Sequence, residues 1–359
     1  MRYLGDYSRG RDNNLNLIRM IAAAGVLVSH AWPLTMGSGA VQPLVRVTGH
    51  SLGTICVYVF FAISGFLIAA SFDRSDTIRF VAARVLRLIP GLFVSVAVVA
   101  LLMGPMVTTL PVSDYLTNSD VYKFILRNTA MLSPLYTLPG VFETNPYPTV
   151  EGSIWTLAHE AICYVGIFLV GVLGVLKRRV LMSAVLLLYA VLWLVVEITE
   201  PVLHGRVAEL HSLTLPFAVG TALYLWRDRV MLTTPILLGL LTLTVLLRIS
   251  LPENNIAYHL ALIAAIAYST FWFAHVPNGW IRHYNRFGDY SYGLYIYAFP
   301  IQGLLVYLMP GMTPLENIAW SFPATMIASV LSWHFVEKPA LALRNRVTTI
   351  VGQSHSTLP

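Results

Sequence analysis

Residues 52–72 read LGTICVYVFFAISGFLIAASF and contain no charged side chain. A stretch of about 20 residues, rising 1.5 Å each, forms a helix that crosses the roughly 30 Å hydrocarbon core of a bilayer. Similar stretches predict about ten spans, at 15–34, 52–72, 88–108, 155–176, 180–198, 207–226, 230–248, 256–275, 288–308 and 317–337. The sequence therefore predicts an all-α, polytopic integral membrane protein.

Composition and charge support this prediction. Hydrophobic residues make up 57% of the chain and charged residues only 11%, whereas soluble domains carry about 25% charged residues. Lys and Arg residues in short loops determine how a membrane protein is oriented, because such loops stay in the cytoplasm. If the N-terminus is cytoplasmic, most of the 23 Lys and Arg residues lie on the cytoplasmic side. We therefore expect both termini to be cytoplasmic. The net charge of +6 then lines the inner face, which argues against a nucleic-acid partner and for contact with membrane lipid.

The spans leave room for one membrane domain. We expect a cytoplasmic segment at 1–14, the ten-helix domain at 15–345 and a cytoplasmic tail at 346–359. Within the domain, 109–154 forms a long outer loop that is expected to be a cap or recognition surface and to contain a short interfacial helix at 120–132. Cys56 and Cys163 fall in or beside spans, which favours buried free thiols over a disulfide or metal framework.

Two ionisable residues, Arg19 and His30, interrupt the first span. An ionisable residue at the centre of a membrane helix costs at least ~2.5 kcal/mol and marks a functional site by default. The interval between them is close to three helical turns, roughly 16 Å, so both face one side. This geometry predicts a polar channel with a cation near the cytoplasmic end and a titratable base nearer the outer end. The alternative is an arginine that reaches the inner interface and a hydrogen-bonded core histidine.

The fourth span begins Trp155-Thr-Leu-Ala-His-Glu160-Ala-Ile-Cys-Tyr164. Glu160 and Tyr164 are four residues apart and share a helix face, close to that of Trp155. An acidic and aromatic surface of this kind suits a sugar. The alternative is a structural pair between Glu160 and a basic residue on a neighbouring helix.

Small and basic residues mark the second and third spans. The pair Ser64-Gly65 favours close packing of another helix, although it could also admit a thin ligand. Arg84 and Arg87 are three residues apart, so their guanidinium groups could bind phosphates together. Equally, they could simply be two of the many Lys and Arg residues on the cytoplasmic side of the membrane.

Several of these patterns occur together in one order, and as an ordered set the chain resembles the acyltransferase-3 family of bacterial membrane O-acyltransferases from about residue 13 to 345. The matching patterns are Arg19 with His30, Phe60-Phe61-Ala-Ile-Ser64-Gly65-Phe66, Arg84-Val-Leu-Arg87-Leu-Ile-Pro90, Trp155 through Tyr164, Ser291-Tyr292-Gly-Leu-Tyr295 and Glu337-Lys338-Pro339.

The resemblance implies an O-acetyltransferase type of enzyme in the bacterial inner membrane. Such an enzyme takes an acyl group, commonly acetyl, from cytoplasmic acyl-coenzyme A and passes it to a hydroxyl of a cell-surface carbohydrate or its precursor. The expected site residues are His30 and Glu160 for catalysis, Arg19, Ser64, Arg84 and Arg87 for the donor, and Trp155 and Tyr164 for the acceptor. No metal is expected, because close His/Cys clusters and carboxylate-rich sites are absent from the sequence.

Two positions depart from the family pattern. Asn16 stands where an acidic residue often precedes the first-span arginine, and Ala298 stands where a histidine is common before Pro300. An asparagine cannot neutralise Arg19, and Ala298 cannot carry a proton. Two other classes of function stay open: a transporter or flippase, whose pathway the polar residues would line, and a scaffold subunit.

Overall fold

The computed structural model describes residues 3–7, 12–199, 203–252 and 255–344. Regular structure in these ranges is helical, apart from two isolated β-bridges. The long helices are α2 (Leu15–Met36), α4 (Leu52–Arg74), α5 (Thr77–Val98), α9 (Trp155–Val172), α10 (Arg179–Thr199), α11 (Arg206–Leu225), α12 (Thr234–Ser250), α13 (Ile256–His275), α14 (Ser291–Leu308) and α15 (Pro314–Ser332). Each predicted span overlaps one of them, which confirms the all-α prediction.

Six of the described helices are long and apolar enough to cross a membrane: α2, α4, the α5 segment that continues to Val107, α9, α10 and α13. The finding confirms an integral membrane protein with several spans. The remaining predicted spans form helices that are shorter or more polar, so the count of about ten and the orientation of the termini stay predictions.

The third span differs from its predicted limits. Helix α5 begins at Thr77, where Asp76 caps it by accepting a hydrogen bond from the backbone N–H of Arg79 at 2.7 Å. The first turns contain Arg79, Arg84 and Arg87, which lower the local hydropathy and hide the start of the helix from a search for apolar residues. A π-helix (Val99–Met103) and α6 (Gly104–Val107) continue the segment.

The long segment after α6 contains two short helices. They are α7 (Val112–Thr117) and α8 (Ser119–Thr129), so the helix predicted at 120–132 is present and shorter. Helix α8 ends where Met131 and Ser133 adopt positive φ angles of 56° and 50°. Asn128 anchors the following turn, because its side-chain amide donates to the carbonyl of Leu135 at 2.9 Å and accepts from the N–H of the same residue at 2.7 Å.

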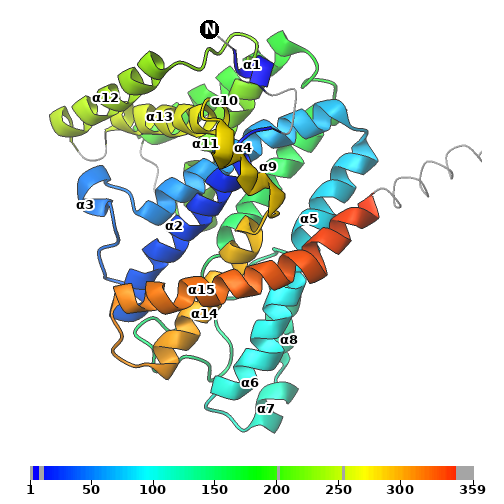
Figure 1. Cartoon of the computed structure of the whole chain (residues 1–359), viewed down its shortest axis with the longest axis vertical. Coiled ribbons are helices and arrows are strands. Elements are labelled where there is room, and N and C mark those ends of the chain that lie inside the picture. The colour runs from blue at the N-terminus through cyan, green and yellow to red at the C-terminus, as the bar shows by residue number, and fades with distance from the viewer. Residues whose placement is uncertain (1–2, 8–11, 200–202, 253–254, 345–359) are drawn as a thin grey trace, which may run out of the picture. The chain divides into compact units, whose positions relative to one another are not determined.

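The contacts divide the chain into two units, each built from separated segments. The first unit comprises the described parts of Met1–Ala22, Leu44–Arg74 and His159–Gly288, and the second those of Ala23–Pro43, Ser75–Ala158 and Asp289–Pro359. In the first unit, α12 lies beside α13, and Leu15, Ile63 and Ala274 form a buried cluster. In the second unit, α14 packs against α15 (Figure 1).

Candidate functional site

Glu160 is the centre of a polar cluster in the first unit. Ser64 on α4 and Tyr164 on α9 both donate hydrogen bonds to the same carboxylate oxygen, Oε1, the tyrosine from 2.5 Å. Hydrogen bonds to an ionised acceptor are stronger than neutral ones, so two of them hold the carboxylate in one orientation. The structure thus brings together three residues to which the sequence assigned three roles: catalysis, donor binding and acceptor binding.

Close packing of α4 and α11 fixes the position of Ser64. A Cβ atom at Gly65 would collide with the backbone carbonyl of Phe217, and one at Gly220 would collide with the carbonyl of Ala62. Thr221 also donates to the carbonyl of Gly65 at 3.2 Å. Small residues that let two helix backbones touch are typical of membrane proteins. Gly65 therefore has the packing role expected of the Ser64-Gly65 pair, while Ser64 faces the carboxylate.

His159, next to Glu160, faces the start of α11. Its Nε2 lies 3.2 Å from the carbonyl oxygen of Arg206 and 3.6 Å from the Glu209 carboxylate, and the side chain is buried. Trp155, the first residue of α9, is half-buried and belongs to the second unit. Its predicted part in acceptor binding stays a prediction.

His30 occupies an aromatic setting in the second unit. Its ring meets the ring of Phe299 edge-on, with centroids 5.2 Å apart and planes at 78°. Phe299 in turn contacts Tyr147 at 6.3 Å, and a Cβ atom at Gly152 would collide with the Phe299 ring. The Nδ1 atom of His30 is buried and has no hydrogen-bond partner among the described residues. A buried, unpaired ring nitrogen is unusual and needs an explanation.

Buried amides tie the same half of α2 to α14 and α15. Gln302 donates to the carbonyl of Leu27 at 3.0 Å and to the side chain of Asn317 at 2.8 Å. Ser29 donates to Gln42 at 2.6 Å. These bonds hold the helix that carries His30 without using the imidazole itself.

Glu151, which the sequence analysis did not select, is a buried carboxyl group in this unit. Its Oε1 accepts from the backbone N–H of Ser153 at 3.2 Å and from the hydroxyl of Ser153 at 2.7 Å. Its Oε2 is buried without a hydrogen-bond partner among the described residues, and the residue is 1% exposed. Burial raises the pKa of Glu151 to about 7. The sequence did not indicate this residue because it precedes the apolar span, where an acidic residue is ordinary. The one available signal was its position just before the small residues Gly152 and Ser153.

The Glu151 loop is joined to α14. Tyr295 donates to the carbonyl of Ser153 at 2.9 Å and shares a 2.5 Å hydrogen bond with the hydroxyl of Thr156. Phe299, one helical turn after Tyr295, contacts His30 and would collide with a Cβ atom at Gly152. The loop before α9 and the helix that faces His30 therefore form one packed region within the second unit.

Arg87 forms an ionic cluster in the second unit. Its guanidinium lies 2.6 Å from the carboxylate of Asp289 and 3.3 Å from that of Glu337, and its side chain is 15% exposed. The rings of Tyr292 and Trp333 lie 5.4 and 6.0 Å from its Cζ atom. Two carboxylates already neutralise Arg87, so a donor phosphate would compete with them.

The other residues predicted to bind the donor are half-buried. Arg19 lies on α2 in the first unit, and Arg84 lies on α5 in the second. Their roles stay predictions. Among the described residues, no group of three or more His, Cys, Asp or Glu side chains is arranged to hold a metal ion.

A family of proteins described as an acyltransferase domain matches residues 12–334 of the chain. The chain belongs to the acyltransferase-3 family. It is therefore an acyltransferase and an integral membrane protein, and the resemblance stated from its sequence is confirmed.

Two relatives match this acyltransferase-3 protein over almost their full length. One is named O-acetyl transferase, from Shigella phage Sf6, with 29% identity over 91% of this chain and 96% of the relative. The other is Nodulation protein 10 from Rhizobium leguminosarum bv. viciae, with 27% identity over 94% of this chain and 96% of the relative. No solved structure shows significant similarity to the chain.

Proposed function

We propose that this acyltransferase moves an acyl group, of which acetyl is the simplest, from cytoplasmic acyl-coenzyme A to a hydroxyl of a cell-surface carbohydrate or its precursor. The name of the phage Sf6 relative, O-acetyl transferase, supports an oxygen acceptor and an acetyl group. The apolar helices support a membrane location, which we place in the bacterial inner membrane.

The observation that carries the proposal is the setting of His30. General-base catalysis needs a group that can take a proton from a hydroxyl near neutral pH, and histidine is the usual choice. The Nδ1 atom of His30 is buried without a partner among the described residues. We propose that the acceptor hydroxyl donates to this nitrogen once the substrate is bound.

The proposed acyl transfer has three steps, and atoms and charge balance over them. His30 takes the proton of the acceptor hydroxyl, and the acceptor oxygen attacks the thioester carbonyl carbon. The new C–O bond forms, the C–S bond breaks, and the imidazolium returns its proton to the departing thiolate of coenzyme A. Transfer through an acyl-histidine is a second route with the same net reaction.

Other residues are proposed to bind the two substrates. The Glu160 carboxylate, held by Ser64 and Tyr164, would orient the acceptor, and Trp155 would offer the acceptor an aromatic face. Arg19, Arg84 and Arg87 would bind the donor's phosphates. For Arg87, this role requires displacement of Asp289 or Glu337.

The first experiment measures coenzyme A release by the purified protein in nanodiscs, supplied with acetyl-coenzyme A and a panel of surface glycans. We expect release to depend on an acceptor. His30→Ala should lower kcat by ~10² or more, whereas Arg84→Ala should mainly raise KM for the donor. His283→Ala is the matched control, because His283 is exposed in the 3-10 helix Gly279–Arg286.

Three outcomes would contradict parts of the proposal. Full activity of His30→Ala would reject this base while keeping the enzyme. Equal effects of both substitutions on KM would reject the division of roles. Absence of coenzyme A release across a broad panel of donors and acceptors would reject transfer from acyl-coenzyme A. Uptake of substrate into sealed proteoliposomes without such release would identify transport instead.

A further inference from the structure

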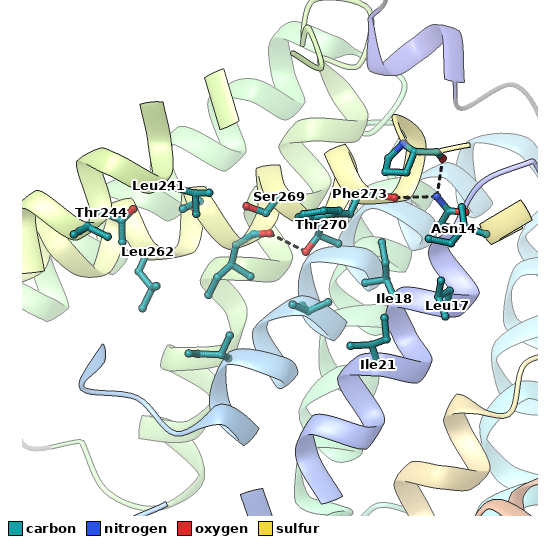
Figure 2. A pocket seen from close by; sticks show the side chains of 17 residues that line it. Asn14, Leu17, Ile18, Ile21, Leu241, Thr244, Leu262, Ser269, Thr270 and Phe273 are labelled. Atoms are coloured by element: carbon teal, nitrogen blue, oxygen red, sulfur yellow. Dashed lines mark hydrogen bonds between the residues drawn. The ribbon is translucent and has the colours of Figure 1, made fainter. Parts of the chain in front are cut away.

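The first unit contains a cavity of about 530 Å³ that is separate from the residues assigned to acyl transfer. Its walls come from the start of α2, from α4, α12 and α13, and from the segment after α13 (Figure 2). Representative lining residues are Ile18, Ile55, Leu241, Leu262 and Phe273.

The lining is suited to hydrocarbon. Its polar residues are Asn14, Thr244, Ser269 and Thr270, and no charged side chain is among the described residues that line it. Thr244 and Thr270 donate to backbone carbonyls of their own helices, Leu240 at 2.8 Å and Ile266 at 2.7 Å. A phosphate or a free sugar inside would leave its polar groups without partners, at about 1–3 kcal/mol each. The cavity therefore fits an alkyl chain.

The cavity is about as long as one bilayer leaflet is thick, and part of its lining is exposed. From Leu262 to Phe273 the wall extends roughly 16 Å along α13, about half of a ~30 Å hydrocarbon core. Four lining residues are exposed hydrophobics, namely Ile21, Leu241, Val245 and Phe273. Exposed apolar side chains on membrane helices face lipid, so a tail from the surrounding leaflet can enter between them.

One end of the cavity carries unpaired polar atoms. Asn14 is 2% exposed, and its Nδ2 donates to the carbonyls of Phe273 at 3.0 Å and Pro277 at 2.9 Å. These two bonds fix the amide, and its Oδ1 is left buried without a partner among the described residues. The hydroxyl of Ser269, one helical turn before Phe273, is also buried and unpaired in the described part of the chain. A ligand with an N–H or O–H donor at this end would satisfy the Asn14 oxygen.

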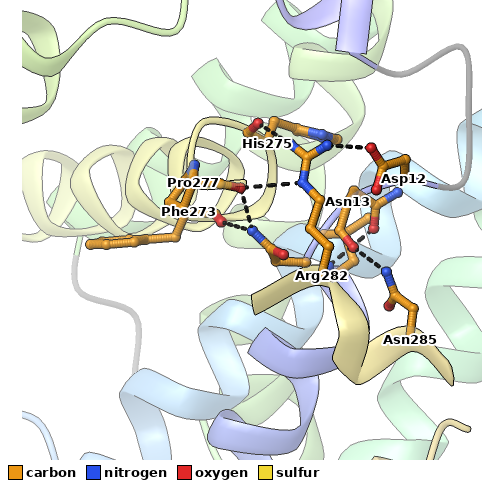
Figure 3. A network of polar contacts seen from close by, with 9 residues as sticks. Asp12, Asn13, Phe273, His275, Pro277, Arg282 and Asn285 are labelled. Carbon is orange, nitrogen blue, oxygen red and sulfur yellow. Dashed lines mark hydrogen bonds and ion pairs between the residues drawn. The ribbon is translucent and has the colours of Figure 1, made fainter. Parts of the chain in front are cut away.

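A pair of opposite charges lies next to this end (Figure 3). Arg282 donates from Nε to the carbonyl of Pro277 at 3.3 Å, the same carbonyl that Asn14 uses. The Arg282 guanidinium also meets the Asp12 carboxylate at 2.5 Å and donates to the carbonyl of His275 at 2.8 Å. The Asp12 side chain is 75% exposed and the Arg282 side chain 18%, so the pair presents mainly the carboxylate to the surroundings, with the edge of the guanidinium beside it.

We propose that this cavity binds a phospholipid of the surrounding leaflet, with one tail inside and an amino-bearing zwitterionic head group at Asn14, Arg282 and Asp12. The ammonium N–H groups meet the Asp12 carboxylate and the Asn14 oxygen, and the phosphate shares Arg282 with Asp12, whose charge the ammonium then balances. The hydroxyl of Ser269 donates to the ester carbonyl of the buried tail. This binding is independent of acyl transfer, and its test uses no acyl-transfer readout.

The test uses the full-length purified protein, stripped of lipid in detergent, and a phosphatidylethanolamine with a photoreactive diazirine in one tail. After illumination, the labelled peptides are identified by mass spectrometry. We expect saturable labelling of α12 and α13. Leu241→Trp, which fills the cavity, should weaken labelling about tenfold, equivalent to ~1.4 kcal/mol.

Leu243→Trp is the matched control, because Leu243 lies on the same helix, does not line the cavity and is 47% exposed against 42% for Leu241. We expect it to label like the wild type. Equal labelling of the two variants, or labelling that never saturates, would overturn the proposal.

Competition tests the head group. Unlabelled phosphatidylethanolamine should displace the probe several-fold better than phosphatidylcholine, which lacks N–H donors, or phosphatidylglycerol, which lacks the ammonium. Ser269→Ala should retain the labelled site and weaken labelling less than Leu241→Trp. Equal competition by all three lipids would overturn the head-group assignment.

Discussion

At Glu160, two hydroxyl groups donate to one carboxylate oxygen. Glu160→Gln preserves the shape of the side chain and removes its charge, so the bonds from Ser64 and Tyr164 lose about half their strength. We expect kcat to fall more than tenfold while the protein stays folded, as checked by coenzyme A release and thermal unfolding. Tyr189→Phe is a control that removes a tyrosine hydroxyl, bonded to Thr214 at 2.7 Å, elsewhere in the first unit. Full activity of Glu160→Gln would assign the carboxylate a structural role.

Glu151 predicts a dependence of stability on pH. Burial raises its pKa from 4.5 to about 7, so the folded protein favours the neutral carboxyl. Its contribution is fully present below pH 4.5 and is lost as pH rises through 7. Above pH 7 the loss approaches roughly 3 kcal/mol. The melting temperature of Glu151→Gln, measured relative to that of the wild type, should therefore rise between pH 5 and pH 8. A difference between the two melting temperatures that stays constant over this range would contradict the prediction.

Residues close in sequence were the ones whose contacts could be predicted. The Glu160–Tyr164 hydrogen bond follows from a spacing of four on one helix. The bond from Ser64 joins positions 96 residues apart, and no local pattern determines such a pairing. Glu151 lies outside the apolar spans, where an acidic residue is ordinary, and only its burial in the fold makes it unusual.

The contact between α4 and α11 can be tested with glycines. Gly65→Ala would place a Cβ atom against the carbonyl of Phe217, and the two helices would have to separate. We expect a loss of stability of about 1–3 kcal/mol, together with reduced activity because Ser64 moves away from Glu160. Gly166→Ala on α9 is the control, since no atom lies within 4 Å of the added methyl group. That variant should be neutral or slightly stabilised, and equal melting temperatures for the two variants would contradict the packing argument.

The elements themselves could be predicted from the sequence more reliably than their ends. Every predicted span overlaps a helix, because the length and apolar character of a membrane helix are set by the bilayer. The start of α5 was placed too late, since its first three turns carry three arginines, of which Arg87 pairs with distant carboxylates. A hydropathy value gives the free energy of placing one side chain in lipid by itself. It does not include a distant carboxylate that lowers this free energy by pairing with an arginine.

At the scale of the whole molecule, Arg87 links three separated parts of the second unit. Arg87→Met would remove the cation that Asp289 and Glu337 both contact, and we expect a loss of stability of about 3–5 kcal/mol. A second substitution, Glu337→Gln, should restore part of it by removing one negative charge. The measurement is thermal unfolding of both variants in detergent. A raised KM for the donor with unchanged stability would instead support direct binding of phosphate by Arg87.

The separation of Arg87 from its partners has a consequence for how the protein is made. Asp289 and Glu337 lie 202 and 250 positions further along the chain. At about 5–20 residues per second, a ribosome needs roughly 10–50 s to add the last of these residues after Arg87. During that interval the growing polypeptide carries the Arg87 guanidinium without the full pair of carboxylates that will neutralise it. The ionic cluster can therefore be completed only after Glu337 has been synthesised, near the end of translation.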